Sequence, residues 1–275
     1  MSDIGAPQEP FGVGAVISES FSIFFKRLIP ILIVGFVVFF LASLVSALLL
    51  GMDVATGQTD PFGIDPTGDL TGPTGGEIAG FFVSALFGLI AYSLMVSVFV
   101  LLAYDAKLGR PARLGGYFGA ALPVIVPTIV LSVVMWILIV FGFLLLIVPG
   151  LWLAALFSVV IPAIVIERAG YSALGRSAQL TKGYRWSIVG VYAVMFLIVI
   201  VVSLILGAVI AGLAALLLAG GGTVGFGSGL TFLAINAVTS ALSYGFTAIM
   251  SAIIYARLRE LKEGVSVASL VDVFR

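Results

Sequence analysis

The residues best suited to binding chemistry form one basic segment in the second half of the chain. Its candidate headgroup-binding or partner-binding residues are Glu167, Arg168, Arg176, Lys182, Arg185 and Trp186. Clustered Lys and Arg side chains at a membrane surface attract phosphate-bearing lipid headgroups. The alternative is structural, with Glu167 paired to a nearby arginine while the other basic side chains fix the topology and reach the interface.

A second polar feature lies nearer the C-terminus, inside an otherwise apolar stretch. Its members, separated by four, three, four and four residues, are Asn236, Ser240, Ser243, Thr247 and Ser251. This spacing places all five on one face of a helix. Such a polar stripe lines a cavity or a solute path, or it lets neighbouring helices pack closely and hydrogen-bond. Both interpretations are open.

The composition excludes much of the common enzyme repertoire. The 275 residues include no cysteine and no histidine, which removes disulfides, thiolate nucleophiles, histidine acid–base catalysis and the usual zinc sites. No acidic or basic residue lies near the middle of an apolar run, which argues against proton- or sodium-coupled transport. We therefore expect no catalytic residues, no metal and no cofactor, and the zero net charge suggests no nucleic-acid partner.

The elements that position these residues are transmembrane helices. The chain is 61% hydrophobic and only 9% charged, with a mean hydropathy of +1.28, which requires a lipid bilayer. We predict an all-α, single polytopic domain over residues 1–275. Its six spans cover about 28–50, 79–104, 121–148, 151–166, 187–219 and 229–256. Pro149 and Gly150 predict a tight turn between the third and fourth spans, and Pro162 predicts a kink in the fourth.

The distribution of charge predicts the topology, because cytoplasmic loops carry an excess of Lys and Arg. Six spans place all 13 basic residues on one side, whereas the outer loop at 51–77 holds five acidic residues and no basic one. Both termini are then cytoplasmic, including a tail at 257–275. The expected location is the inner membrane of a bacterium.

Short amphipathic helices are predicted on the cytoplasmic side, ahead of each pair of spans. The first covers about 11–27, another lies at 171–182, and a weaker one precedes the third span. The spans thus form three hairpins, each preceded by an amphipathic helix, in units of about 11–104, 112–166 and 171–256. Whether these units are a true repeat is open.

One stretch, Val148 to Gly190, resembles a known family. Its pattern is the Pro149–Gly150 pair, a proline-containing span ending in Glu167, the Arg176–Ser177 pair, and a Leu-Thr-Lys-Gly segment followed by Arg185 and Trp186. It resembles bacterial integral membrane proteins described by the membrane domain of glycerophosphoryl diester phosphodiesterases, with related uncharacterised proteins of the YciC type. The resemblance implies a helical inner-membrane domain. It implies no phosphodiesterase activity, because the catalytic domain of such relatives is missing here.

The sequence therefore favours a non-enzymatic membrane protein that binds membrane lipids or other membrane proteins through its basic rim, in a role in membrane homeostasis. The alternative is a transporter or channel for a small uncharged or amphiphilic solute, which the polar stripe would serve.

Overall fold

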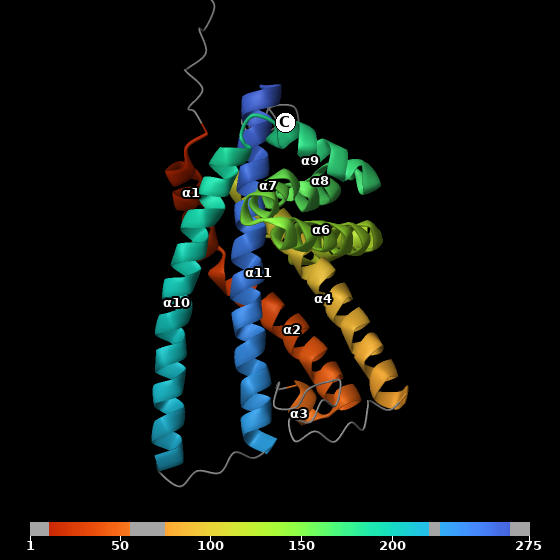
Figure 1. Cartoon of the computed structure of the whole chain (residues 1–275), viewed down its shortest axis with the longest axis vertical. Coiled ribbons are helices and arrows are strands. Elements are labelled where there is room, and N and C mark those ends of the chain that lie inside the picture. Colours follow the sequence, from red (N-terminus) through yellow and green to blue (C-terminus); the bar gives the residue numbers. More distant parts are fainter. Residues whose placement is uncertain (1–10, 56–74, 220–225, 265–275) are drawn as a thin grey trace, which may run out of the picture. The chain divides into compact units, whose positions relative to one another are not determined.

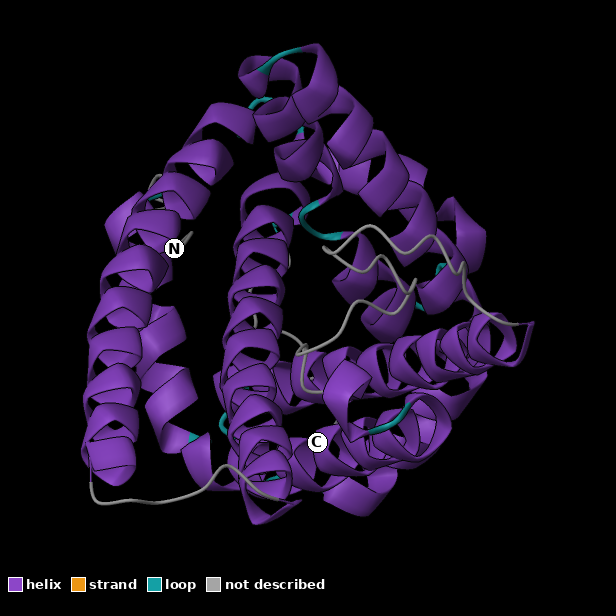
Figure 2. Cartoon of the chain, turned by 60° about the horizontal axis from the view of Figure 1, so that its bottom comes forward, coloured by secondary structure: helices purple, strands orange, loops and turns teal. Residues whose placement is uncertain are grey.

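The protein is all-helical throughout residues 11–55, 75–219 and 226–264, which are the residues that the computed structural model describes (Figure 2). No strand occurs in these ranges. The helices, with two short 3₁₀ segments η1 and η2, are α1 (Val13–Lys26), α2 (Leu28–Leu50), α3 (Met52–Ala55), α4 (Gly75–Lys107), α5 (Leu114–Ala121), η1 (Leu122–Val124), α6 (Ile125–Leu145), α7 (Ile147–Phe157), α8 (Val160–Glu167), η2 (Gly170–Ser172), α9 (Ala173–Thr181), α10 (Arg185–Ala219) and α11 (Phe226–Glu263).

Helices long and apolar enough to cross a membrane account for most of the chain. Within the described residues five qualify: Leu28–Leu50, Ile78–Lys107, Leu114–Leu145, Ile147–Glu167 and Gly229–Glu263. A sixth arises if Gly170–Thr181 and Arg185–Val201, bent by 98° at the break between them, are taken as one span. The expectation of an all-helical chain is thereby confirmed for the described residues, and these five or six candidate spans are consistent with a multi-pass membrane protein.

Several boundaries differ from those expected. α11 continues to Glu263, so residues 257–263 are helical rather than part of a tail, and 265–275 lie outside the described residues. Of the outer loop predicted at 51–77, residues 52–55 form α3, and α4 already begins at Gly75. Residues 56–74 also lie outside the described part of the chain.

The turn between the third and fourth spans lies three residues earlier than predicted. The chain breaks at Leu146, whose backbone is extended (φ −166°, ψ 158°), and α7 starts with the next residue. Pro149 therefore stands in the first turn of α7, where its missing N–H leaves no helical hydrogen bond unmade. The prediction of a turn at Pro149–Gly150 was wrong because proline and glycine also serve inside helices.

Gly150 is required by the packing of α6 against α7 instead. A Cβ atom at this position would clash with the ring of Phe143, and a Cβ atom at Gly142 would stand 3.1 Å from the Gly150 Cα atom. Two glycines facing each other let helix backbones approach closely, as at many membrane helix crossings. The two helices thus form a hairpin whose close contact depends on the absence of side chains.

The fourth span is interrupted near Pro162. α7 ends at Phe157, α8 begins at Val160, and the hydroxyl of Ser251 donates a 2.6 Å hydrogen bond to the carbonyl oxygen of Ser158. In a continuous helix this carbonyl would accept from the N–H of residue 162, but proline has none. The buried Ser251 hydroxyl, on α11, therefore replaces the missing backbone donor.

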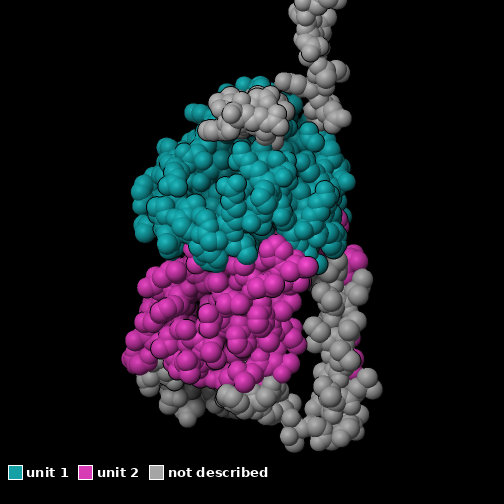
Figure 3. Space-filling view, turned by 180° about the vertical axis from the view of Figure 1, so that it is seen from behind, with its two compact units in different colours: residues 1–28, 96–197, 245–275 teal, residues 29–95, 198–244 magenta. Residues whose placement is uncertain are grey.

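The chain divides into two compact units (Figure 3). Unit 1 comprises residues 1–28, 96–197 and 245–275, and unit 2 comprises 29–95 and 198–244. Every basic residue that the structure describes belongs to unit 1. The units are interleaved along the sequence rather than consecutive. The single polytopic domain and the three-hairpin repeat stay predictions.

The core of unit 1 surrounds the C-terminal part of α11, the longest helix (Figure 1). Residues 248–256 are buried without exception, and Ile249, Ile254 and Tyr255 have no exposed surface. A helix covered on all sides carries apolar residues all round. The chain then becomes charged at Arg257, so the first charged residues of α11 stand at the edge of this core.

We expect Gly150→Ala to destabilise the α6–α7 hairpin, because its methyl group has no room beside Phe143. Overpacking of this kind costs about 1–3 kcal/mol. The matched control is Gly115→Ala in α5, where nothing lies within 4 Å of an added Cβ atom. Thermal unfolding in detergent should show a lower midpoint for Gly150→Ala alone. Equal midpoints for the two variants would contradict this packing.

We expect Ser251→Ala to lower the free energy of unfolding by about 1 kcal/mol, because the Ser158 carbonyl loses its donor. In a Pro162→Ala background the same substitution should cost less, since residue 162 regains an N–H that can reach this carbonyl. A double-mutant cycle, measured by unfolding in mixed micelles, reports the difference. Additive effects would show that the two donors do not substitute for each other.

Candidate functional site

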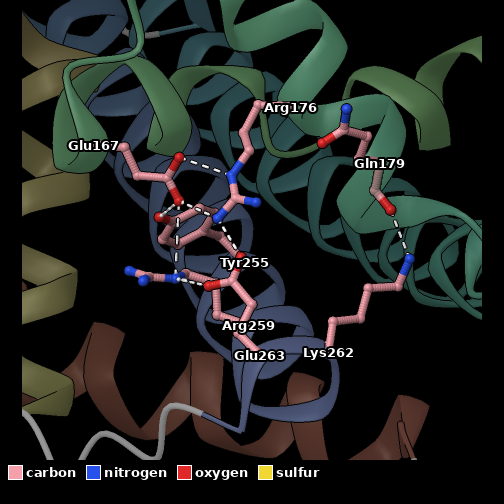
Figure 4. Close-up of polar contacts among 7 residues, drawn as sticks. All are labelled: Glu167, Arg176, Gln179, Tyr255, Arg259, Lys262 and Glu263. Atoms are coloured by element: carbon pink, nitrogen blue, oxygen red, sulfur yellow. Dashed lines mark hydrogen bonds and ion pairs between the residues drawn. The ribbon is translucent and has the colours of Figure 1, made fainter.

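Glu167, the last residue of α8, is the centre of an ion-pair network in unit 1 (Figure 4). The Arg176 guanidinium, from α9, donates to both carboxylate oxygens, with Nε–Oε2 and Nη2–Oε1 distances of 2.8 and 2.7 Å. The Tyr255 hydroxyl, from α11, donates to Oε1 at 2.6 Å. A bidentate arginine and a neutral donor on one half-buried carboxylate join three helices at a single point.

Two residues from the last turns of α11 complete the network. Glu263 accepts from Arg176, and it accepts from the Arg259 Nε at 2.8 Å. Arg259 also lies 3.8 Å from Glu167 Oε1. With two arginines and two glutamates the network is electrically neutral. The charge of Arg176 is therefore already balanced by Glu167 and Glu263.

A second neutral network joins α1, α4 and α11. Lys107 Nζ lies 2.9 Å from Glu19 Oε1 and 3.7 Å from Glu260 Oε1. Arg257 pairs with the same two carboxylates at 3.4 and 3.7 Å. Only 9% of the Lys107 side chain is exposed, so its charge depends on these partners.

Every described acidic residue of unit 1 therefore has a basic partner within ion-pair distance. Five carboxylates, including Asp105 at 3.8 Å from Arg110, pair with five basic side chains. The described basic residues that have no carboxylate within ion-pair distance are Lys26, Arg27, Arg113, Arg168, Lys182, Arg185 and Lys262. The described part of unit 1 therefore keeps a net positive charge after all of its carboxylates have been paired.

Three of these unpaired cations gather at the C-terminal end of α9. Lys182 is its C-cap, Arg185 Nη2 donates to the Ala178 carbonyl at 3.3 Å, and Lys262 Nζ donates to the Gln179 carbonyl at 2.5 Å (Figure 4). Cations suit the last carbonyls of a helix. We call Lys182, Arg185 and Lys262 the cation trio.

The charges of the trio act on one another. Lys262 lies beyond the apolar part of α11, in a seven-residue end (257–263) that holds five charged side chains. Lys182 and Arg185 carry the same sign of charge as Lys262, so the three side chains repel one another. This mutual repulsion has no carboxylate to relieve it within the described structure, so an anion placed there would be stabilised.

Aromatic side chains accompany the trio. The Arg185 guanidinium lies over the Trp152 ring, 4.3 Å from the centroid, and its Nε is buried with no hydrogen-bond acceptor among the described residues. Trp186, directly after it, is 67% exposed. Tryptophan is enriched where a membrane meets water.

The predicted headgroup residues therefore separate into two groups. Glu167 and Arg176 are bound to each other, as the structural alternative held, while Lys182 and Arg185 belong to the cation trio beside Trp186. Arg168 belongs to neither. It ends α8 in the left-handed conformation (φ 54°), with its side chain exposed.

The polar stripe of α11 also separates. Asn236 and Ser240 line a cavity in unit 2, whereas Ser251 is buried in unit 1 and bonds to Ser158. Ser243 and Thr247 are exposed. The five residues of the stripe therefore lie in different environments, and both interpretations stay predictions.

Sequence reasoning missed Tyr255, Arg259, Glu263 and Lys262. The first three continue the stripe of α11 from Ser251 at intervals of four residues. Extending that periodicity past the predicted end of the span at residue 256 would have indicated that they share a face. Lys262 shows no such pattern, because its partner is a backbone carbonyl of another helix.

The chain matches no model of a protein family, no curated protein and no solved structure at a significant level.

We expect Arg176→Gln to lower the free energy of unfolding by about 1–3 kcal/mol, because it leaves the half-buried Glu167 without its bidentate partner. Arg168→Gln removes the same charge from an exposed position eight residues earlier in the chain and should leave stability nearly unchanged. Unfolding in mixed micelles, with lipid absent, measures both. A loss in both variants would mean that net charge, and not the network, is responsible.

Proposed function

We propose that the chain is a non-enzymatic inner-membrane protein of a bacterium that binds the phosphate groups of anionic lipids at the cation trio, on the cytoplasmic side. In keeping with the resemblance of Val148–Gly190, we place it among the membrane-domain proteins related to the YciC type. Its role is the organisation of lipids or of other membrane proteins around this surface.

The observation that carries the proposal is the presence of three cations at one helix end with no described carboxylate within ion-pair distance, since the neighbouring Glu263 is paired with Arg176 and Arg259. Every described acidic residue of unit 1 is already paired elsewhere, so nothing within the described protein neutralises Lys182, Arg185 and Lys262. A lipid phosphate supplies the missing negative charge and several strong acceptor oxygens. The buried Arg185 Nε is a donor that still lacks such an acceptor.

The surroundings also support a lipid rather than a soluble anion. The Arg185 guanidinium lies over the Trp152 ring, the next residue in the chain is the exposed Trp186, and tryptophan prefers the headgroup level of a bilayer. The positive-inside rule puts the basic unit on the cytoplasmic side, where the membrane surface is negative.

We expect the wild-type protein, reconstituted with equal amounts of phosphatidylglycerol and phosphatidylcholine, to retain phosphatidylglycerol in native mass spectrometry. The triple variant Lys182→Gln, Arg185→Gln, Lys262→Gln should lose it. At about 1 kcal/mol for each basic residue near the surface, the loss amounts to roughly 100-fold in affinity.

The matched control neutralises the same number of charges at exposed, unpaired positions: Lys26→Gln, Arg113→Gln, Arg168→Gln. It should retain the lipid. An equal loss of phosphatidylglycerol in the two triple variants would show that general surface charge, and not the cation trio, binds the lipid. Full retention in the trio variant would rule out the proposed site.

A further inference from the structure

Unit 2 contains a cavity of about 280 Å³ between α2, α4 and α11. Small-molecule sites measure roughly 300–1,000 Å³, so this cavity stands at the lower end of that range. None of its lining residues carries a charge. Its chemistry is therefore distinct from that of the cation trio, which belongs to unit 1.

Each of the three helices contributes one aromatic residue to the cavity, followed along the helix by two small or polar residues. The residues, taken from an aromatic start in steps of one helical turn, are Phe39, Ser43 and Ser46 on α2, Tyr92, Gly88 and Ser84 on α4, and Tyr244, Ser240 and Asn236 on α11. An aromatic side chain thus stands at one end of each face, and small or polar side chains follow it.

Contacts between the helices align these faces. At the aromatic end, the ring centroid of Tyr244 lies 5.3 Å from that of Phe39 and 5.2 Å from that of Tyr92. At the polar end, Ser84 Oγ donates to Ser46 Oγ at 2.8 Å. The cavity is open to the surface, with aromatic side chains at one end and hydroxyl groups and one amide at the other.

We propose that this cavity binds an uncharged, hydroxyl-bearing amphiphile with a headgroup about the size of glycerol. The aromatic end contacts its apolar part, because aromatic rings provide large apolar surfaces. The serine hydroxyls and the Asn236 amide both donate and accept hydrogen bonds, as hydroxyl groups of a ligand require. A charged group is disfavoured, because the cavity offers no opposite charge to offset the cost of leaving water.

Gly88 offers a way to close the cavity without disturbing the helices. It lines the cavity, and nothing lies within 4 Å of where a Cβ atom would stand. A leucine side chain there fills the space that a ligand would occupy. Ala85 is the matched control, since it is exposed on the same helix and does not line the cavity.

The test uses three probes with the same ten-carbon chain: 1-monodecanoylglycerol, decyl sulfate and decyltrimethylammonium. The full-length protein in phosphatidylcholine nanodiscs is titrated with each, and native mass spectrometry counts the molecules bound. We expect one glycerol ester to bind at least tenfold more tightly than either charged probe. Gly88→Leu should weaken its binding at least tenfold without lowering the unfolding temperature, and Ala85→Leu should have no effect.

Asn236→Leu should reduce the preference for the glycerol ester over the charged probes, whereas Thr239→Leu, at an exposed position one turn along, should not. Equal binding of all three probes, or unaltered binding in Gly88→Leu, would overturn the proposal. Gly88→Leu is also expected to retain phosphatidylglycerol, so failure at this cavity and failure at the cation trio are distinguishable.

Discussion

The carboxylate of Glu167 is the point on which the arrangement of unit 1 depends. It ends α8, receives two hydrogen bonds from α9 and one from α11, and is half-buried at the edge of the apolar core. A carboxylate in that position is stable only when its charge is compensated and its oxygens are hydrogen-bonded. Meeting this requirement fixes the position of α9, and α9 in turn presents its C-terminal carbonyls to the cation trio.

Two neighbouring residues of α9 hold this helix in place. Arg176 bonds to Glu167, and the neighbouring Ser177 donates to the carbonyl of Leu156 at 2.6 Å, near the end of α7. Both residues hold α9 against the interrupted fourth span. These bonds occupy Arg176 and Ser177 within the protein, whereas Lys182 and Arg185 have no carboxylate partner among the described residues.

The two candidate sites use opposite chemistry, and the distribution of charge explains why. Unit 1 contains every described basic residue and pairs its carboxylates internally, so its surplus is positive. The cavity of unit 2 is lined by neutral hydroxyl, amide and aromatic groups only. An anionic group suits the first environment and an uncharged polar group suits the second, because in each case desolvation must be offset by the groups present.

The sequence by itself determined the all-helical class, the run of spanning helices and the separation of charge, because these follow from hydropathy, from length and from the cost of placing charges in hydrocarbon. It also offered the pairing of Glu167 with a nearby arginine as one interpretation, without selecting the arginine. Only the tertiary structure decided where the turn at Leu146 falls, that Ser251 replaces the donor missing at Pro162, and which cations remain unpaired. Those outcomes depend on side chains and carbonyls that are far apart in the sequence, such as Lys262 and Gln179. Such contacts cannot be predicted from local periodicity, because it reports only which residues share a face of one helix.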